Sequence, residues 1–214
     1  LTASATPNGV ALIAVAADGD NAIVVSPGAN GRVTPADIEA SAPLLEAATV
    51  TLLQLEIPVD AVTAAARLAR GTVVLNPAPA PGELPEELIA AVDVLVPNQT
   101  ELATLAGHDG PVDTATAVEL ARTLPHAATV VTLGADGALV IDGDATHVEA
   151  PVVQPVDTTA AGDSFCGALA DALVGGSSLV EAARWAVRVG AATTLRPGAQ
   201  PSLPTPTEVE SLLR

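Results

Sequence analysis

Three small residues, Ala160, Ala161 and Gly162, come directly before the acidic Asp163 and open a segment whose apolar residues recur at helical spacing. Such residues let a ligand approach the backbone, and unpaired N–H groups at a helix start favour an anion. A carboxylate there repels the anion, unless it accepts a proton from a hydroxyl group that attacks a phosphoryl group held by the N–H groups. The pattern therefore indicates phosphoryl transfer. A helix N-cap whose small residues pack against a neighbour is the alternative interpretation.

Polar residues also follow several apolar runs that are typical of strands. Glu56 and Asn98 each follow such a run, and Thr132 stands at the end of a third, shortly before Gly134 and Gly137. In open α/β sheets, ligands bind beyond the carboxyl ends of the strands, so several polar groups at one sheet edge indicate a binding site. Each of them singly has a structural alternative, as a helix cap, a loop residue or the approach to a hairpin.

Composition excludes several classes of protein. The chain has 214 residues and no lysine, because all eight basic residues are arginine, and this excludes a Walker-type phosphate loop and a Schiff-base lysine. The formal charge of −17 and the near absence of aromatic residues argue against nucleic-acid binding. No apolar run reaches membrane-spanning length and no secretory signal is visible. The single Cys166 fits a reducing compartment, so we expect a cytoplasmic protein without a membrane partner.

The elements that position these residues alternate along the chain. A hairpin of strands 10–16 and 21–26, with its turn at Asp18–Asn21, precedes short apolar strands separated by helices, which predicts βαβ units and a mostly parallel open sheet flanked by helices in three layers. Strands are expected at 49–55, 72–76, 92–96, 128–133, 138–141 and 145–149, and helices at 35–47, 58–70, 85–90, 99–106, 113–124, 162–174, 178–193 and 206–213.

The run Asp157-Thr-Thr-Ala-Ala-Gly-Asp-Ser-Phe-Cys-Gly-Ala168 resembles the C-terminal signature of ribokinase-like (PfkB-type) carbohydrate kinases. The motif is long and ordered, which makes it far more specific than a glycine pattern. The resemblance implies an α/β kinase in which Asp163 is the catalytic base and also contacts the sugar. It further implies that the N–H groups of Ala160, Ala161 and Gly162 stabilise charge on the transferred phosphoryl group.

Other segments match the same family. Asn98-Gln-Thr-Glu101 resembles its Asn-x-x-Glu motif, which implies that Asn98 lies near the ATP phosphates and that Glu101 acts on Mg²⁺ through bound water; a helix capping pair is the alternative, and both can hold together. The segment Thr132 to Gly137, with Gly134, resembles the loop that supports the nucleotide, and Glu56 matches a glutamate that binds sugar hydroxyls.

A third resemblance concerns a monovalent cation such as K⁺. The segment Arg196-Pro-Gly-Ala-Gln-Pro-Ser202 resembles the part of the family that encloses this ion together with the signature. An ordinary proline- and glycine-containing loop is the alternative. The ligands that the resemblance implies are Asp157, Ser202 and the backbone carbonyls of Thr159, Thr193, Arg196 and Gly198.

The resemblance runs over essentially the whole chain but covers about the last two-thirds of the family domain. Residues 1–27 would be a partial hairpin lid and connection, and residues 28–214 the nucleotide-binding and catalytic domain, without the N-terminal part that grips the sugar. The expected activity is ATP-dependent phosphorylation of D-ribose to ribose 5-phosphate, in a homodimeric parent protein. Two alternatives stay open: a kinase for another sugar or nucleoside, and an inactive nucleotide-binding fragment.

Overall fold

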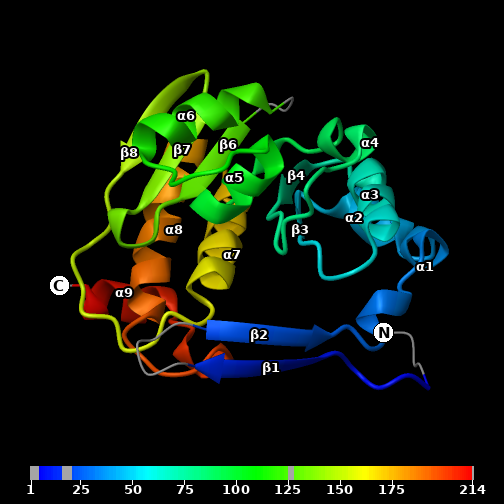
Figure 1. The fold of residues 1–214 in the computed structure, drawn as a ribbon, viewed down its shortest axis with the longest axis horizontal. Helices are drawn as coiled ribbons and strands as arrows, with labels where there is room; N and C mark the ends of the chain where they lie inside the picture. Colours follow the sequence, from blue (N-terminus) through cyan, green and yellow to red (C-terminus); the bar gives the residue numbers. More distant parts are fainter. Residues whose placement is uncertain (1–4, 16–20, 125–127, 214) are drawn as a thin grey trace.

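A computed structural model describes residues 5–15, 21–124 and 128–213 and contains a central sheet with helices on both of its faces (Figure 1). The sheet order follows the chain order, and the first four strands run parallel to one another, whereas the last two are antiparallel to their neighbours. This confirms the predicted mostly parallel, three-layer α/β architecture. The strands are β3 (Val50–Leu53), β4 (Thr72–Leu75), β5 (Val94–Leu95), β6 (Ala128–Thr132), β7 (Ala138–Asp142) and β8 (Asp144–Val148).

Two sets of helices cover the sheet because side chains alternate between its faces. On β4, Val74 belongs to the core with Leu169, whereas Val73 and Leu75 belong to a second core with Val62 on the opposite face. The first face is covered by α7 (Ala161–Val174) and α8 (Leu179–Thr193), and α9 (Pro206–Leu212) packs beside them. The second face is covered by α3 (Val59–Leu68), α4 (Glu86–Ile89), α5 (Gln99–Ala106) and α6 (Thr114–Thr123).

One predicted helix is in fact two. The expected continuous helix 35–47 is divided into α1 (Pro35–Glu39) and α2 (Ala42–Ala47), so that prediction was wrong. Pro43 has no N–H group to donate to the carbonyl four residues earlier, and its ring conflicts with that turn of a helix. The first helix therefore ends before Pro43, and the second begins around it, where a proline is tolerated.

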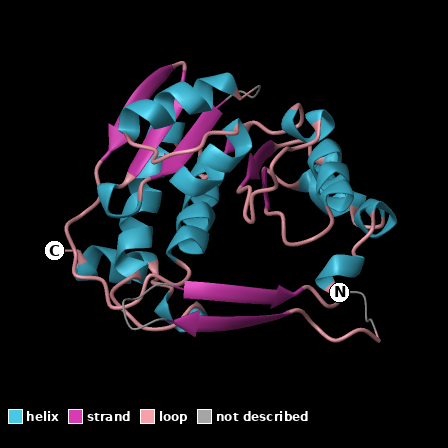
Figure 2. Cartoon of the chain, viewed as in Figure 1, coloured by secondary structure: helices cyan, strands magenta, loops and turns pink. Residues whose placement is uncertain are grey.

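A separate two-stranded sheet precedes the domain, and it lies apart from the central sheet (Figure 2). It pairs β1 (Val10–Val15) with β2 (Asn21–Ser26) in antiparallel register, as predicted, while the expected turn residues 18–20 lie outside the described part of the chain. Leu12 and Val24 are paired on one face and are each 67% exposed, and Val25, on the other face, is 63% exposed. Both faces of this hairpin therefore present apolar side chains to solvent.

Three short 3₁₀ helices complete the described elements. They are η1 (Asn30–Arg32), η2 (Gly134–Asp136), which links β6 to β7, and η3 (Gln200–Ser202), which precedes α9. The last two lie in segments that the sequence marked as binding loops. Within the described ranges, none of the helices is long and apolar enough to cross a lipid bilayer.

Candidate active site

The start of α7 has an unusual backbone. Ala160, its N-cap, has a φ of 60° in the left-handed region, and among the described residues it is the one non-glycine residue with positive φ. This conformation costs an L-residue roughly 1–2 kcal/mol. Strain of this kind collects at functional sites, where the surrounding structure holds it in place.

Free donors gather at this turn. Ser164 N–H donates to Ala160 O at 2.9 Å, which closes the first turn of α7, and Ala161 N–H donates to Thr158 O at 3.2 Å. Within the described chain the N–H groups of Ala160, Gly162 and Asp163 have no acceptor. Two of the three N–H groups expected at the site are thus free, whereas the third, from Ala161, is engaged. The N–H of Asp163 is a free donor that the sequence did not indicate.

A cavity of about 460 Å³ opens beside this turn. Gly162 and Phe165 of α7 line it, together with Gly190 of α8. The end of β6 and the β6–β7 turn contribute three residues that the sequence assigned to the nucleotide: Thr132, Gly134 and Gly137. The structure therefore brings these three residues and Gly162 to one cavity, most of whose lining is apolar, as expected for a small-molecule pocket.

The β6–β7 turn depends on Gly137. Its φ is +91°, and a Cβ atom there would stand 2.0 Å from the carbonyl oxygen of Val148 on β8. Leu133 N–H donates to Gly137 O at 2.8 Å, and Gly137 N–H donates to Gly134 O at 3.1 Å. A residue without a side chain is needed for this close approach between the turn and the end of β8.

Asn98 and Glu101 form the capping pair of α5. Asn98 Oδ1 accepts from Glu101 N–H, and Glu101 Oε2 accepts from Asn98 N–H, both at 2.8 Å. Asn98 also lies beside Thr132, because Thr132 N–H donates to Pro97 O at 2.9 Å. Burial raises the pKa of Glu101, and this outweighs the Asn98 hydrogen bond, which lowers it. The capping interpretation is thus confirmed, and one oxygen of Glu101 stays available for another partner.

Asp163 and Glu101 act on a common neighbour. Burial raises the pKa of the Cys166 thiol to about 12, and the negative charges of Asp163 and Glu101 add to this rise. The two carboxylates, which lie 62 positions apart in the sequence, are therefore close enough to the same point on α7 to interact with it electrostatically. The raised pKa also keeps Cys166 protonated and unreactive, in agreement with a packing role.

Asp157 connects the signature to the loop after α8. Its Oδ1 accepts from Thr159 N–H at 2.9 Å, and its Oδ2 accepts from Gly198 N–H at 2.8 Å. The Gly198 bond is the first cause of its lowered pKa, and the Thr159 bonds follow. The N–H of Asp157 in turn donates to Thr194 O at 3.2 Å. The expected neighbourhood of Asp157 and Gly198 is thus present, and Asp157 is held as a carboxylate.

The other residues expected around the cation lie in the same region. The Thr193 carbonyl accepts from Arg196 N–H at a long 3.5 Å, and the Arg196 guanidinium contacts Glu208 Oε1 of α9 at 2.7 Å. Ser202 is fully buried in η3, with its hydroxyl donating to Ala199 O at 2.6 Å. Asp157 is thus joined to the end of α8 through Thr194 O and to the following loop through Gly198 N–H.

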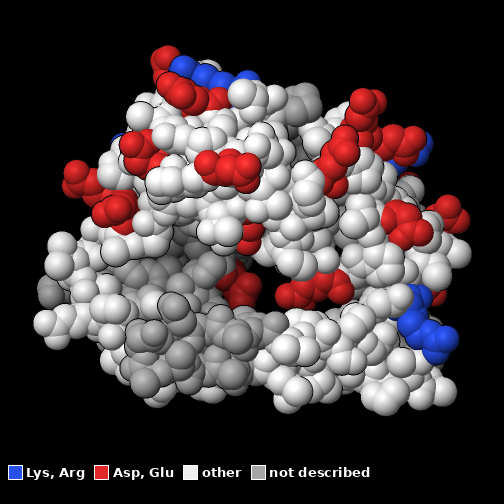
Figure 3. All heavy atoms as spheres, viewed as in Figure 1, with Lys and Arg blue, Asp and Glu red and all other residues white. Residues whose placement is uncertain are grey.

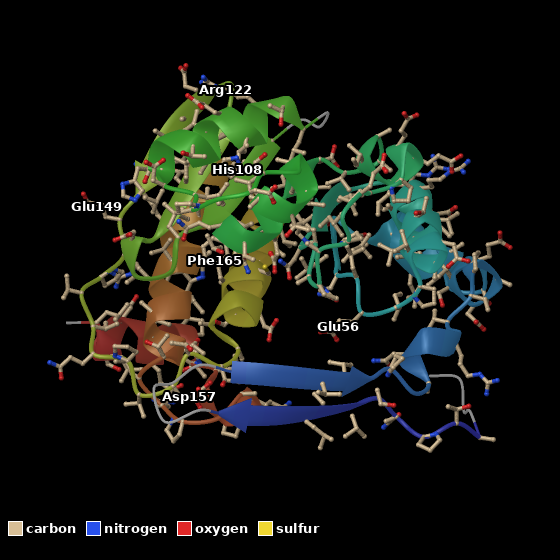
Figure 4. The ribbon with its side chains drawn as sticks, viewed as in Figure 1. Glu56, His108, Arg122, Glu149, Asp157 and Phe165 are labelled. Atoms are coloured by element: carbon tan, nitrogen blue, oxygen red, sulfur yellow. The ribbon has the colours of Figure 1, made fainter. Side chains whose placement is uncertain are left out.

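Glu56 lies apart from this cluster. It is exposed after β3 and projects toward the hairpin (Figure 4). In the space-filling view the molecule is hollowed between the hairpin and the sheet domain, and acidic side chains lie at the margins of the hollow (Figure 3). Asp163 is also exposed, and it lines a groove of about 550 Å³ beside Trp185 and Gln200.

Some residues at the carboxyl edge of the sheet and around the cavity were not singled out by the sequence analysis. Asn76 follows β4, and its side-chain amide donates to Val96 O at 2.8 Å, which ties together the carboxyl ends of β4 and β5. Its place after an apolar run is the signal that could have found it. Phe165 and Gly190 also line the cavity. Phe165 belongs to the signature but was given no role there, and a glycine inside a helix carries no such signal.

The whole chain can be compared with known proteins. The model of the pfkB family carbohydrate kinases matches residues 2–206. The chain belongs to this family. A ribokinase of Schizosaccharomyces pombe is 38% identical to this pfkB-family chain in an alignment of 213 positions, which covers 94% of the chain and 66% of the relative. The chain thus spans about two thirds of the length of that curated relative.

Solved structures agree with the family assignment. A ribokinase of Thermotoga maritima superposes with a TM-score of 0.87 at 34% identity, covering 98% of this chain and 71% of that one. A ribokinase of Arabidopsis thaliana, solved in complex with ribose and ATP, superposes with a TM-score of 0.86 at 30% identity. The superposition covers 98% of this chain and 70% of the Arabidopsis chain. The fold of this pfkB-family chain is therefore the fold of ribokinases.

Proposed function

We propose that this chain carries the catalytic part of a ribokinase, which phosphorylates D-ribose to ribose 5-phosphate with ATP. The observation that carries the proposal is the start of α7, where the free N–H groups of Gly162 and Asp163 stand beside the exposed carboxylate of Asp163. Gly162 also lines the 460 Å³ cavity, so a nucleotide in that cavity would bring its terminal phosphate to these donors.

The residues then have separate roles in one transfer step. The sugar hydroxyl oxygen forms a bond to the terminal phosphorus of ATP, its proton passes to the Asp163 carboxylate, and the bond from phosphorus to the ADP oxygen breaks. The free N–H groups, with Ala160 among them, hold the oxygens of the transferred group. Such preorganised donors stabilise the transition state because they need no rearrangement during the reaction.

Mg²⁺ would neutralise the ATP phosphates. Among the described residues, no three acidic, histidine or cysteine side chains come together around a point that could hold a metal. This arrangement fits an ion held by water and phosphate oxygens, since Mg²⁺ keeps several waters and needs one or two carboxylates. Glu101 would supply its carboxylate through bound water, and Asn98 lies next to it at the same edge.

K⁺ would bind at Asp157. The donor set suits such an ion because Asp157 is held as a carboxylate, and the carbonyls of Thr159, Thr193, Arg196 and Gly198 and the Ser202 hydroxyl would supply neutral oxygens. A large monovalent ion accepts many oxygens without strict geometry. When bound, it would supply positive charge close to the signature segment. Asp157, through its bonds to Thr159 and Gly198, would keep the signature and the following loop in register.

The hairpin would be part of a lid, with residues 1–27 as lid and connection and residues 28–214 as the catalytic domain. Its apolar side chains on both faces support this assignment, because one face could cover the sugar while the other contacts a second copy of the chain. Glu56, which projects toward the hairpin, would accept hydrogen bonds from sugar hydroxyls (Figure 4). A homodimer follows from this use of the hairpin.

The expected surroundings of the enzyme are cytoplasmic, because ATP is available there and Cys166 is a free, buried thiol. The acidic surface argues against nucleic acid as a partner, since phosphate backbones would be repelled. No membrane partner is proposed. Ribose, ATP and a second copy of the chain are sufficient partners for the reaction.

The test compares Asp163→Asn with the unchanged protein, both as the 214-residue chain and as the product of the coding sequence extended upstream of Leu1. We expect turnover of ribose to fall by about two to four orders of magnitude while ATP affinity is kept. A panel of sugars and nucleosides identifies the acceptor. Unchanged turnover would remove Asp163 from its role, and ATP binding without turnover in either form would favour a non-catalytic nucleotide-binding protein.

A further inference from the structure

Two polar side chains are buried between α7 and α8. Thr193 is fully buried in the last turn of α8, and Ser164, in the first turn of α7, is 9% exposed. Their hydroxyl oxygens lie 2.9 Å apart, although the residues are 29 positions apart in the sequence. A buried hydroxyl is costly without a partner, so a paired arrangement between two helices is a specific feature of this chain.

The number of protons limits the directions that these hydrogen bonds can take. Ser164 Oγ lies 2.9 Å from Ala161 O, and Thr193 Oγ1 lies 2.9 Å from both Ser164 Oγ and Val189 O. Each hydroxyl has one proton, and a carbonyl can only accept. If both protons pointed to carbonyls, two oxygens would face each other without a proton, so one hydroxyl donates to the other. In the arrangement that reaches α7, Thr193 donates to Ser164 Oγ, and the Ser164 proton goes to the Ala161 carbonyl.

This relay ends on the peptide that serves the candidate site. The Ala161 carbonyl and the Gly162 N–H belong to one planar peptide group, so fixing one orients the other. Hydrogen bonds in a chain polarise one another, and an acceptor that is already bonded makes the N–H of its own peptide a better donor. The Ala161 carbonyl also lies against α8, since a Cβ at Gly190 would stand 3.4 Å from Ala161 O, an ordinary contact distance.

We propose that Thr193 and Ser164 are positioning residues, which form a buried hydroxyl relay that orients and polarises the Ala161–Gly162 peptide toward a bound phosphate. The proposal rests on the proposed function, because it takes the Gly162 N–H as a phosphate donor. The relay also starts in the residue whose carbonyl would face K⁺. It therefore joins the end of α8 to the donor turn of α7.

The test variants distinguish the effect of losing a hydroxyl group from the effect of a change in packing. Thr193→Val keeps the shape and removes the hydroxyl, and Ser164→Ala removes the middle of the relay. Ser164→Thr keeps the hydroxyl and adds a methyl group next to the groove that Ser164 lines. The matched control is Thr63→Val, because Thr63 Oγ1 also donates to a carbonyl four residues earlier in its helix, at 2.7 Å, on the opposite face of the sheet.

Binding is measured by calorimetry with a non-hydrolysable ATP analogue and with AMP. We expect Thr193→Val and Ser164→Ala to bind the analogue on the order of five- to tenfold more weakly, which corresponds to the net free energy of about one hydrogen bond. Both variants should keep their affinity for AMP. Ser164→Thr and the control Thr63→Val should stay within about twofold of the unchanged protein.

A second measurement does not depend on nucleotide binding. In ¹⁵N–¹H spectra, Thr193→Val should shift the Gly162 amide resonance, although the substituted residue is remote in sequence, while Thr63→Val should leave it in place. An unmoved Gly162 resonance in Thr193→Val would overturn the proposal. Equal losses of affinity for the analogue and for AMP in the relay variants would overturn it as well. An unchanged protein that binds neither nucleotide would contradict the proposed function, and the Gly162 resonance would still decide the relay.

Discussion

The N–H of Gly162 can be removed with little change to the fold by the substitution Gly162→Pro. Gly162 is the second residue of α7, and proline is tolerated in the first turn of a helix because the N–H groups there have no partner within the helix. An added Cβ meets nothing within 4 Å. Because Ala161 before it must stay helical, some stability is lost, and thermal unfolding measures how much.

The effect on phosphate binding follows from the lost donor. Within the described chain the Gly162 N–H has no acceptor, so its removal leaves no protein group unpaired. A hydrogen bond to a charged group contributes roughly 1.5–3 kcal/mol. We therefore expect Gly162→Pro to bind a non-hydrolysable ATP analogue roughly 10- to 100-fold more weakly than Gly162→Ala, which also carries a Cβ but keeps the N–H.

The assay is calorimetric titration of both folded variants with the analogue, at a temperature well below both unfolding midpoints. Circular dichroism provides the check that α7 and its neighbours stay helical. Equal affinities for the analogue in two variants with equal helicity would refute the reasoning, because the N–H would then make no contribution to phosphate binding.

Two further predictions concern the stability of the fold, at Glu208 of α9 and at Gly137 of the β6–β7 turn. The Thr205 backbone bond and the Arg196 contact lower the pKa of Glu208 from 4.5 to about 2. The ionised Glu208 therefore stabilises the fold fully above pH 4.5, and this contribution is lost as the pH falls toward 2. Urea-unfolding midpoints measured across this pH range should fall less in Glu208→Gln than in the unchanged protein. Gly137→Ala should destabilise the protein by roughly 4 kcal/mol or more in thermal unfolding, because its Cβ would overlap the Val148 carbonyl, and an unfolding midpoint near that of the unchanged protein would contradict the argument.

Local chemistry made most elements predictable from the sequence. Asn98 with Glu101, and Ser178 with Glu181, form reciprocal caps at the starts of α5 and α8, and such pairs depend on residues three positions apart. Apolar runs between helices also predicted the parallel sheet. The break between α1 and α2 was missed, although Pro43 gave a local signal for it.

Contacts between distant residues could not be predicted from local patterns. The Asp157–Gly198 bond joins residues 41 positions apart, and it forms because α7 and α8 pack side by side. The free N–H of Asp163 and the engaged N–H of Ala161 depend on the left-handed backbone at Ala160, which alanine rarely adopts. Sequence therefore indicated the residues of the site, whereas the tertiary structure determines which of their atoms are available.

A crystal structure of the chain with Mg²⁺ and a non-hydrolysable ATP analogue tests the central claim most directly. The account predicts the terminal phosphate at the start of α7, within hydrogen-bonding distance of the Gly162 and Asp163 N–H groups and next to the Asp163 carboxylate. The remainder of the nucleotide should occupy the cavity between the β6–β7 turn and α8. A terminal phosphate bound away from the start of α7 would contradict the account.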